Sequence, residues 1–280
     1  MEVNKQLLQE TCENMGYPIE FQERKKENRN LTAVTFLFTK EESNASPMFY
    51  LEEMESFFDG DYTHLVKHLV EQAKKFMEEL VFPNTFDVKM LENWESIKNI
   101  IRATLRHDCV ELDSLVSVDF CNLHIIFYIN IPLNNGYTGM AKITKDLFEK
   151  WNITIEELCE KAFENCTEFK MAIKEKNANL YTAKEFLMTN EEEDEGAIAL
   201  AHPGIIPVMA ENFDCNLIVL APSTRDVHII KTDADELSLS ETFSLIAQLC
   251  SFSEEIPEDM QLSKVPYFYN RKTKTMTVCD

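Results

Sequence analysis

Hydrophobic residues recur along this chain with two periods, one typical of helices and one typical of strands. In residues 61–80 the apolar positions form one stripe, with Lys and Glu on the opposite side, which predicts an amphipathic helix. Residues 31–39 are apolar or small on both faces, which predicts a strand at the centre of its sheet. The same periods predict helices at 4–15, 88–105, 154–165 and from Ser238, with Phe243, Leu245, Ile246 and Leu249 inward in the last, and strands at 18–23, 116–131, 140–143, 267–270 and 274–278.

Residues 196–231 contain three apolar runs and one helical pattern in a fixed order. Two continuous runs, Ala197–Ala201 and Leu217–Pro222, flank residues 205–213, whose apolar side chains cluster at helical spacing. A polar turn and the third run, Val227–Lys231, follow. This order predicts strand, helix, strand and strand, a β-α-β-β unit.

The acidic run Glu191–Glu195 separates that unit from the residues before it. Such a run is typically solvated, so we place a subdomain boundary there. The expected fold class is α+β, with an N-terminal subdomain over 1–190 and a C-terminal subdomain over 191–280. In each subdomain we expect helices packed on a small, mainly antiparallel sheet.

Charge is the one unusual feature of the composition. Among 280 residues, 27 Lys and Arg stand against 49 Asp and Glu, for a net charge of −22. Such a surface repels phosphate and anionic lipid, which argues against direct binding to nucleic acid or membrane. No apolar run approaches the roughly 18–20 residues of a membrane span, and residues 1–17 lack the pattern of a secretory signal. Eight scattered cysteines then indicate reduced thiols in a cytoplasm.

Polar residues gather at the two junctions of the β-α-β-β unit. His202 lies at the first junction, and Ser223, Thr224, Arg225 and Asp226 lie at the second. Ser, His and Asp are the residue types of a hydrolase triad, but the chain lacks the nucleophile motif Gly-x-Ser-x-Gly. Short turns between strands use Ser, Thr and Asp for backbone reasons alone. We therefore assign no catalytic residue and treat these five as candidate binding residues.

Four other residues, His107, Cys109, Cys121 and His124, are of the types that bind zinc. If 116–131 is one strand, Cys121 and His124 point to opposite faces, which a tetrahedral site cannot use. The chain also lacks the glycine-rich loops that hold nucleotide phosphates, and it has only six glycines. We expect neither a metal nor an organic cofactor.

Four groups of motifs spread over the chain match a family pattern. They are Ser43-Asn44-Ala45-Ser46-Pro47 with Tyr50-Leu51, Phe127-Tyr128 with Trp151–Leu158, Pro203-Gly204-Ile205-Ile206 with Leu217–Val227, and Tyr267–Thr273. In these motifs the whole chain resembles a domain family of unknown function from gut Firmicutes, clostridia among them, whose members are often encoded on integrative mobile elements. The resemblance implies no assigned reaction.

The chain departs from that family pattern at both junctions. The family has Ser-x-His-Glu where this chain has Ser223-Thr224-Arg225-Asp226, and it usually has Tyr in place of His202. A guanidinium does not lose its proton near neutral pH. Position 225 therefore cannot supply a general base in this chain.

The expected function is binding without catalysis, by a cytoplasmic accessory protein of a mobile element whose partner is a protein encoded nearby. One alternative is an acidic DNA mimic that inhibits a DNA-binding host protein, although Lys25, Lys26 and Arg271 interrupt the acidity. A further alternative is a hydrolase that works from His202 and Ser223. The sequence determines neither the identity of the partner nor the oligomeric state.

Overall fold

The chain divides into two compact units, and each of them is built from two separate stretches of the sequence. The first unit contains Met1–Glu92 and Ile131–Gly139, and the second contains Asn93–Asn130 and Met140–Asp280. The computed structural model describes residues 3–26, 29–38, 47–55, 57–79, 88–107, 110–132, 138–174, 178–180, 182–190, 195–254, 256–257 and 260–279.

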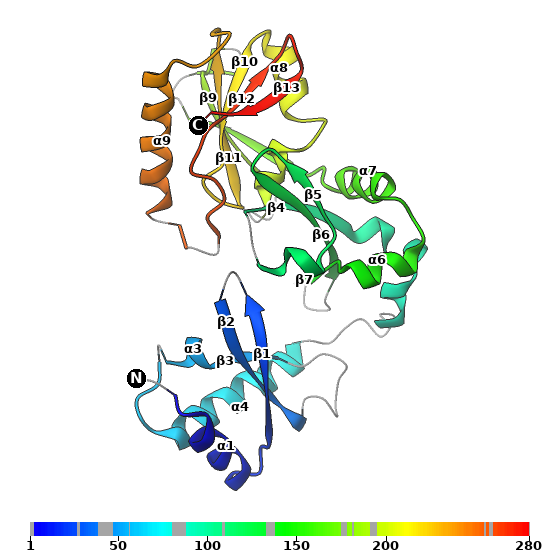
Figure 1. Ribbon diagram of the computed structural model, residues 1–280, viewed down its shortest axis with the longest axis vertical. Coiled ribbons are helices and arrows are strands. Elements are labelled where there is room, and N and C mark those ends of the chain that lie inside the picture. Colours follow the sequence, from blue (N-terminus) through cyan, green and yellow to red (C-terminus); the bar gives the residue numbers. More distant parts are fainter. Residues whose placement is uncertain are drawn as a thin grey trace. The chain divides into compact units, whose positions relative to one another are not determined.

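The first unit packs helices against a three-stranded antiparallel sheet of order β1-β2-β3 (Figure 1). Its core joins Leu8 of the first helix, Val34 and Phe36 of the central strand, and Leu69 of the longest helix. The strands predicted at 18–23 and 31–39 are observed as β1 and β2, which pair antiparallel. The predicted burial of the second strand is confirmed, because all residues from Leu31 to Phe36 are buried. The elements are α1 (Lys5–Asn14), β1 (Ile19–Lys26), β2 (Arg29–Phe36), β3 (Phe49–Tyr50), α3 (Leu51–Met54), α4 (Tyr62–Glu79) and η1 (Val88–Glu92).

The second unit contains two antiparallel sheets, which confirms the α+β class. The smaller sheet has the order β4-β6-β5, with β7 also paired to β6, and the larger has the order β13-β12-β10-β11-β9-β8. Residues 134–136, between β6 and β7, have the sequence Asn-Asn-Gly, which favours a tight turn, and they lie outside the described residues. The strands are β4 (Ile101–Arg106), β5 (Ser117–Phe120), β6 (Leu123–Pro132), β7 (Thr138–Lys142), β8 (Phe169–Ile173), β9 (Glu185–Asn190), β10 (Asn216–Leu220), β11 (Asp226–Thr232), β12 (Tyr267–Asn270) and β13 (Thr275–Val278).

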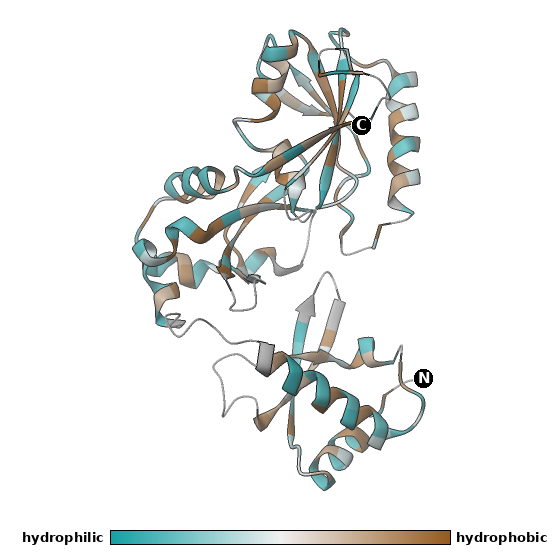
Figure 2. Ribbon diagram, turned by 180° about the vertical axis from the view of Figure 1, so that it is seen from behind, coloured by the Kyte–Doolittle hydropathy of each residue, from teal (hydrophilic) through white to brown (hydrophobic). Residues whose placement is uncertain are grey.

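Helices lie on both faces of the six-stranded sheet, with α9 on one face and α8 on the other (Figure 1). Leu249 of α9 packs against Ile218, Leu220 and Phe268 of the sheet. Figure 2, coloured by hydropathy, shows hydrophobic residues in brown along the strands of this sheet and at intervals along α9. No described helix is both long and apolar enough to cross a membrane. The helices of this unit are α5 (Trp94–Ile97), η2 (Lys98–Ile100), η3 (Val110–Ser114), α6 (Lys145–Trp151), α7 (Ile155–Asn165), η4 (Gly196–Leu200), α8 (Ile206–Phe213) and α9 (Leu239–Ser253).

The helix predicted over 88–105 is wrong in its second half. Short helical turns run only to Ile100, and β4 begins at Ile101. Ile101, Ala103 and Leu105 are all buried and pair with β6. Apolar residues at 97, 101 and 105 fit a helix, but those at 101, 103 and 105 fit a strand equally well, and pairing with β6 decides between the two.

The strand predicted at Ala197–Ala201 is also wrong, because Gly196–Leu200 forms the 3-10 helix η4. All five residues of η4 are buried. A short buried run of small residues has the same pattern in a strand and in a helix. The predicted β-α-β-β unit is therefore a 3-10 helix, α8, β10 and β11.

The observed division of the chain differs from the predicted boundary at residues 190/191. Strands β8 and β9 come before that position, and β10 to β13 come after it, yet all six belong to one sheet. The register pairs Asp226 with Thr189 across β11 and β9. Of the acidic run placed at the boundary, Glu195 is only 6% exposed, and residues 191–194 lie outside the described residues.

Candidate functional site

His202 lies between η4 and α8, and both nitrogens of its ring form hydrogen bonds. The backbone N–H of Gly204 donates to Nδ1 at 3.0 Å, so Nδ1 carries a lone pair. Nε2 therefore carries the proton and donates it to the carbonyl oxygen of Phe163 at 3.1 Å. The rings of Phe163 and Phe169 contact the imidazole edge-on. These contacts attach the junction to the end of α7.

Burial lowers the pKa of His202 below its ordinary value, and the hydrogen bond to Phe163 only partly opposes that effect. The imidazole is therefore neutral at neutral pH, and its lone pair already accepts from Gly204. A general base needs a lone pair that reaches the proton it removes. His202 thus holds the junction together and offers no free base.

Ser223, Arg225 and Asp226 form a hydrogen-bonded turn between β10 and β11. The Ser223 hydroxyl accepts from the backbone N–H of Arg225 at 3.1 Å and donates to Asp226 Oδ1 at 3.3 Å. The carbonyl of Arg225 accepts from the Thr189 hydroxyl at 2.8 Å, while the Arg225 side chain is exposed. This is the turn chemistry expected of Ser and Asp between strands.

Thr224 connects this turn to the first junction through its backbone. Its N–H donates to the carbonyl of Met260 at 2.9 Å, and its carbonyl accepts from the N–H of Ala197 at 3.0 Å. The structure thus brings Ser223 and Asp226 together and joins the turn to η4. Among the described residues, no hydrogen bond links the His202 ring to Ser223 or Asp226.

Gly196 allows the chain to pass close to the turn. A Cβ atom at this position would lie 2.3 Å from the carbonyl oxygen of Arg225 and 2.7 Å from the backbone nitrogen of Asn190. Both neighbours are backbone atoms, so they cannot move aside as a flexible side chain could. Glycine alone avoids the clash, which explains its place at the start of η4.

Glu195 precedes Gly196 and forms a buried ion pair that the sequence pattern does not reveal. Arg106 donates to both carboxylate oxygens, from Nη1 to Oε2 at 2.7 Å and from Nη2 to Oε1 at 2.5 Å. The hydroxyl of Thr104 also donates to Oε2. A buried carboxylate requires such partners, and the pair fixes η4 on β4.

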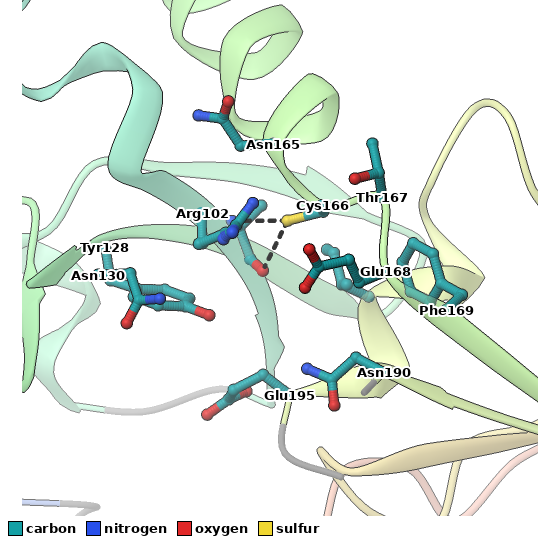
Figure 3. A pocket seen from close by; sticks show the side chains of 12 residues that line it. Arg102, Tyr128, Asn130, Asn165, Cys166, Thr167, Glu168, Phe169, Asn190 and Glu195 are labelled. Atoms are coloured by element: carbon teal, nitrogen blue, oxygen red, sulfur yellow. Dashed lines mark hydrogen bonds between the residues drawn. The ribbon is translucent and has the colours of Figure 1, made fainter. Parts of the chain in front are cut away.

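A hollow of about 450 Å³, including space open to solvent, lies beside this ion pair (Figure 3). Arg102 of β4 and Tyr128 of β6 are paired directly across the two strands, so their side chains share one face of the sheet. Asn130 follows on the same face of β6. Glu168 and Phe169, at the beginning of β8, line the opposite side.

Cys166 and Asn165 form the wall of the hollow at the end of α7. The Cys166 thiol accepts from the N–H of Ala103 at 3.5 Å and donates to its carbonyl at 3.9 Å (Figure 3). The Asn165 amide donates to the carbonyls of Lys98 and Ile101 at 2.7 and 2.9 Å. Burial raises the pKa of the Cys166 thiol, so it is protonated at neutral pH and serves as an anchor.

The four residues considered as zinc ligands do not form a cluster in the described chain. Residues 116–131 are two strands, and Cys121 lies in the turn between them with a φ of +54°. His124 Nδ1 is 3.0 Å from the Asp119 carboxylate, and Cys109 lies outside the described residues. Within those residues, no group of three or more His, Cys, Asp or Glu side chains could hold a metal ion.

Helix α9 exposes an apolar face. Leu239 is 74% exposed and Phe243 is 68% exposed, and Ala247 and Cys250 are exposed as well. These four residues lie one, two and three turns apart, on one side of the helix. We call them the outer face of α9. The inward orientation predicted for Phe243 is wrong, because α9 is apolar on two sides and Leu249 belongs to the side that contacts the sheet.

The sequence in and around α9 is rich in acidic residues. Residues 232–263 contain eight Asp and Glu and no Lys, Arg or His. Glu241 lies in the first turn of the helix and Glu254 follows its last residue. Asp235 is partly neutralised by Lys272, whose Nζ lies 3.0 Å from its carboxylate. The outer face is therefore an apolar stripe in an acidic setting.

Comparison with known proteins places the chain in a family. No curated protein and no solved structure matches it. A family model described as "Family of unknown function (DUF5688)" matches residues 1–271. Since that match covers both units almost completely, the chain belongs to this family of unknown function.

Proposed function

We propose that this protein acts by binding another protein, and that the outer face of α9 is its contact surface. The observation that carries the proposal is the exposure of two large apolar side chains one turn apart on α9, Phe243 at 68% and Leu239 at 74%. Burying a Phe or Leu side chain contributes about 1.5–3 kcal/mol. Aromatic residues at the centre of an interface also dominate the free energy of binding.

The charge around this face indicates the chemistry of the partner. An apolar stripe flanked by Glu241 and Glu254 matches a segment with apolar residues on one side and Lys or Arg beside them. A basic amphipathic helix has both features. A second copy of this chain matches poorly, because each copy carries a net charge of −22.

The two junctions support binding over hydrolysis. A serine hydrolase needs a base that bonds its nucleophile. Here the Ser223 hydroxyl bonds Asp226, and the lone pair of His202 accepts from Gly204. In the setting that the family resemblance implies, the partner is encoded near this gene on a mobile element, and both proteins act in the cytoplasm.

The test measures binding of a fluorescent basic amphipathic peptide, with Leu on one face and Lys on the other, by fluorescence anisotropy. Replacing Phe243 or Leu239 by Ser leaves the charge unchanged, so we expect each variant to weaken binding about tenfold or more. Val208→Ser, at an exposed position of α8 (48%), is the matched control and should bind like the wild type. Equal binding by all variants would show that the outer face is not the contact surface.

The same titration separates this proposal from the acidic DNA mimic. A mimic binds through charge alone, so its affinity should fall steeply with salt and should not depend on Phe243. Binding through the outer face should keep its dependence on Phe243 at high salt. Analytical ultracentrifugation of the protein without peptide tests whether a second copy of the chain binds the outer face. If the wild type self-associates and Phe243→Ser does not, the outer face is the interface of a homodimer and the proposed basic partner is wrong.

A further inference from the structure

Two neighbouring arginines on β4 differ in their partners. Arg102 and Arg106 point to the same side of the strand, because they are separated by an even number of residues. The guanidinium of Arg106 is occupied by Glu195 and by the hydroxyl of Thr104. Within the described chain, Arg102 forms no side-chain hydrogen bond or ion pair, and its side chain lines the hollow.

A carboxylate faces the same hollow without neutralising Arg102. Glu168 projects from the opposite wall (Figure 3), and among the described residues no ion pair joins it to Arg102 or to any other cation. Glu195 also lines the hollow, but its carboxylate is paired with Arg106. The charged groups of the hollow that remain without an ion-pair partner among the described residues are therefore Arg102 and Glu168, which do not pair with each other.

We propose that this hollow binds a small zwitterion of the amino-acid type. The guanidinium of Arg102 holds the carboxylate of the ligand through two parallel hydrogen bonds, the geometry that arginine favours with carboxylates. Glu168 holds the ammonium group. Tyr128 and Asn130 supply polar atoms on the Arg102 side, and Phe169 supplies an apolar wall.

The charges favour a zwitterion over a simple anion. Phosphate carries up to two negative charges and would be repelled by Glu168, whereas an amino acid matches both charges at once. This inference involves no residue of α9 and is independent of the binding function proposed above.

The test is a calorimetric titration of the whole protein with each of the twenty L-amino acids. Acetate, methylammonium and inorganic phosphate serve as comparison ligands, because each carries charge of one sign only. We expect at least one amino acid to bind, and to bind at least about tenfold more tightly than acetate or methylammonium. If no amino acid binds, or if phosphate binds more tightly than every amino acid, the proposal is wrong.

Variants identify the hollow as the place of binding. Arg102→Gln should weaken amino-acid binding at least about tenfold, and Arg102→Lys should weaken it less, because the charge remains while the fork geometry is lost. Glu168→Gln should weaken amino-acid binding but leave acetate binding unchanged or stronger. Arg24→Gln, in the first unit, is the matched control and should leave binding unchanged. Amino-acid binding that survives both Arg102→Gln and Glu168→Gln would overturn the proposal.

Far-UV circular dichroism and the melting temperature check that Arg102→Gln is folded. Glu168 is exposed, so Glu168→Gln tests the proposal at a position where the substitution does not disturb the core.

Discussion

His228 is a buried histidine placed beside a lysine. It is 6% exposed, and its Nδ1 accepts a hydrogen bond from the Lys174 ammonium at 2.7 Å. Its ring stacks on Phe252 of α9 at 4.6 Å between centroids. Burial and then the charge of Lys174 lower the pKa of His228, and the effects of Glu185 and Asp226 only partly oppose them. The neutral imidazole is thus the form that the folded state favours.

The free energy of unfolding should therefore decrease as the pH falls below the ordinary histidine value of 6.5. In that range the unfolded chain binds a proton before the folded chain does, so acid favours unfolding. The decrease ends once the pH is below the folded pKa of His228. Urea unfolding between pH 7.5 and pH 5, followed by circular dichroism, measures this dependence.

His228→Asn is the informative variant, because the Asn side-chain oxygen can accept from Lys174 at the position of Nδ1 but does not titrate. The variant should lose less stability than the wild type over the same pH range. His202→Asn makes the equivalent change at the other histidine with a lowered pKa. An unchanged pH dependence in His228→Asn would show that other groups cause the decrease.

At the residue scale, local roles could be predicted from the sequence and long-range partners could not. The turn roles of Ser223 and Asp226 follow from residue type and position between two strands. The pair between Arg106 and Glu195 joins residues 89 positions apart, so no local pattern contains it. The same holds for the hollow, because Arg102 and Glu168 line it together only after β4 and β8 have taken their places in the fold.

Among the elements, α9 has a complete N-terminal capping box, formed by Ser238 and Glu241. The Ser238 hydroxyl accepts from the Glu241 backbone N–H at 3.3 Å, and the Glu241 carboxylate accepts from the Ser238 backbone N–H at 2.9 Å. These bonds satisfy backbone groups that the first turn of a helix leaves without partners. They also hold Leu239 and Phe243, which lie in the first turns of the outer face.

Replacing Ser238 by Ala should destabilise α9 by about 1 kcal/mol, the usual cost of losing an N-cap side chain. Hydrogen exchange of the amides in the first two turns of α9 measures the effect. Ser240→Ala is the matched control, because Ser240 is exposed and lies inside the same turn without a capping role. Equal exchange in the two variants would contradict a capping contribution.

Elements with one dominant period could be predicted, and elements with two compatible periods could not. The hairpin of β1 and β2, the helix α4 and the capped helices α7 and α9 have clear patterns, and all are observed. Residues 97–105 and 197–201 fit both a helix and a strand, and their neighbours in space decide the outcome. α9 has two apolar sides, so the pattern identifies the helix but not the side that meets the sheet.

At the scale of the whole molecule, the acidic run leads to a predicted subdomain boundary at residues 190/191. Strand pairing contradicts that boundary, because strands on both sides of it belong to one sheet. A run of acidic residues indicates a solvated segment, but it does not show which strands pair across that segment. β9 pairs with β11 along five residue pairs, from Asp226 with Thr189 to Ile230 with Glu185. Cutting the chain at 190/191 would remove β8 and β9 and leave β11 at the edge of its sheet.

A fragment of residues 191–280 should therefore not fold alone. It would lose the partner strand of β11, the ion pair between Glu195 and Arg106, and the hydrogen bond from His202 to Phe163. A fragment of residues 93–280 keeps all three, so it should retain native near-UV circular dichroism and a cooperative thermal transition. A cooperative transition in the shorter fragment would show that its four remaining strands, α8 and α9 form an independent folding unit, and that the pairs made with β4, α7 and β9 are dispensable.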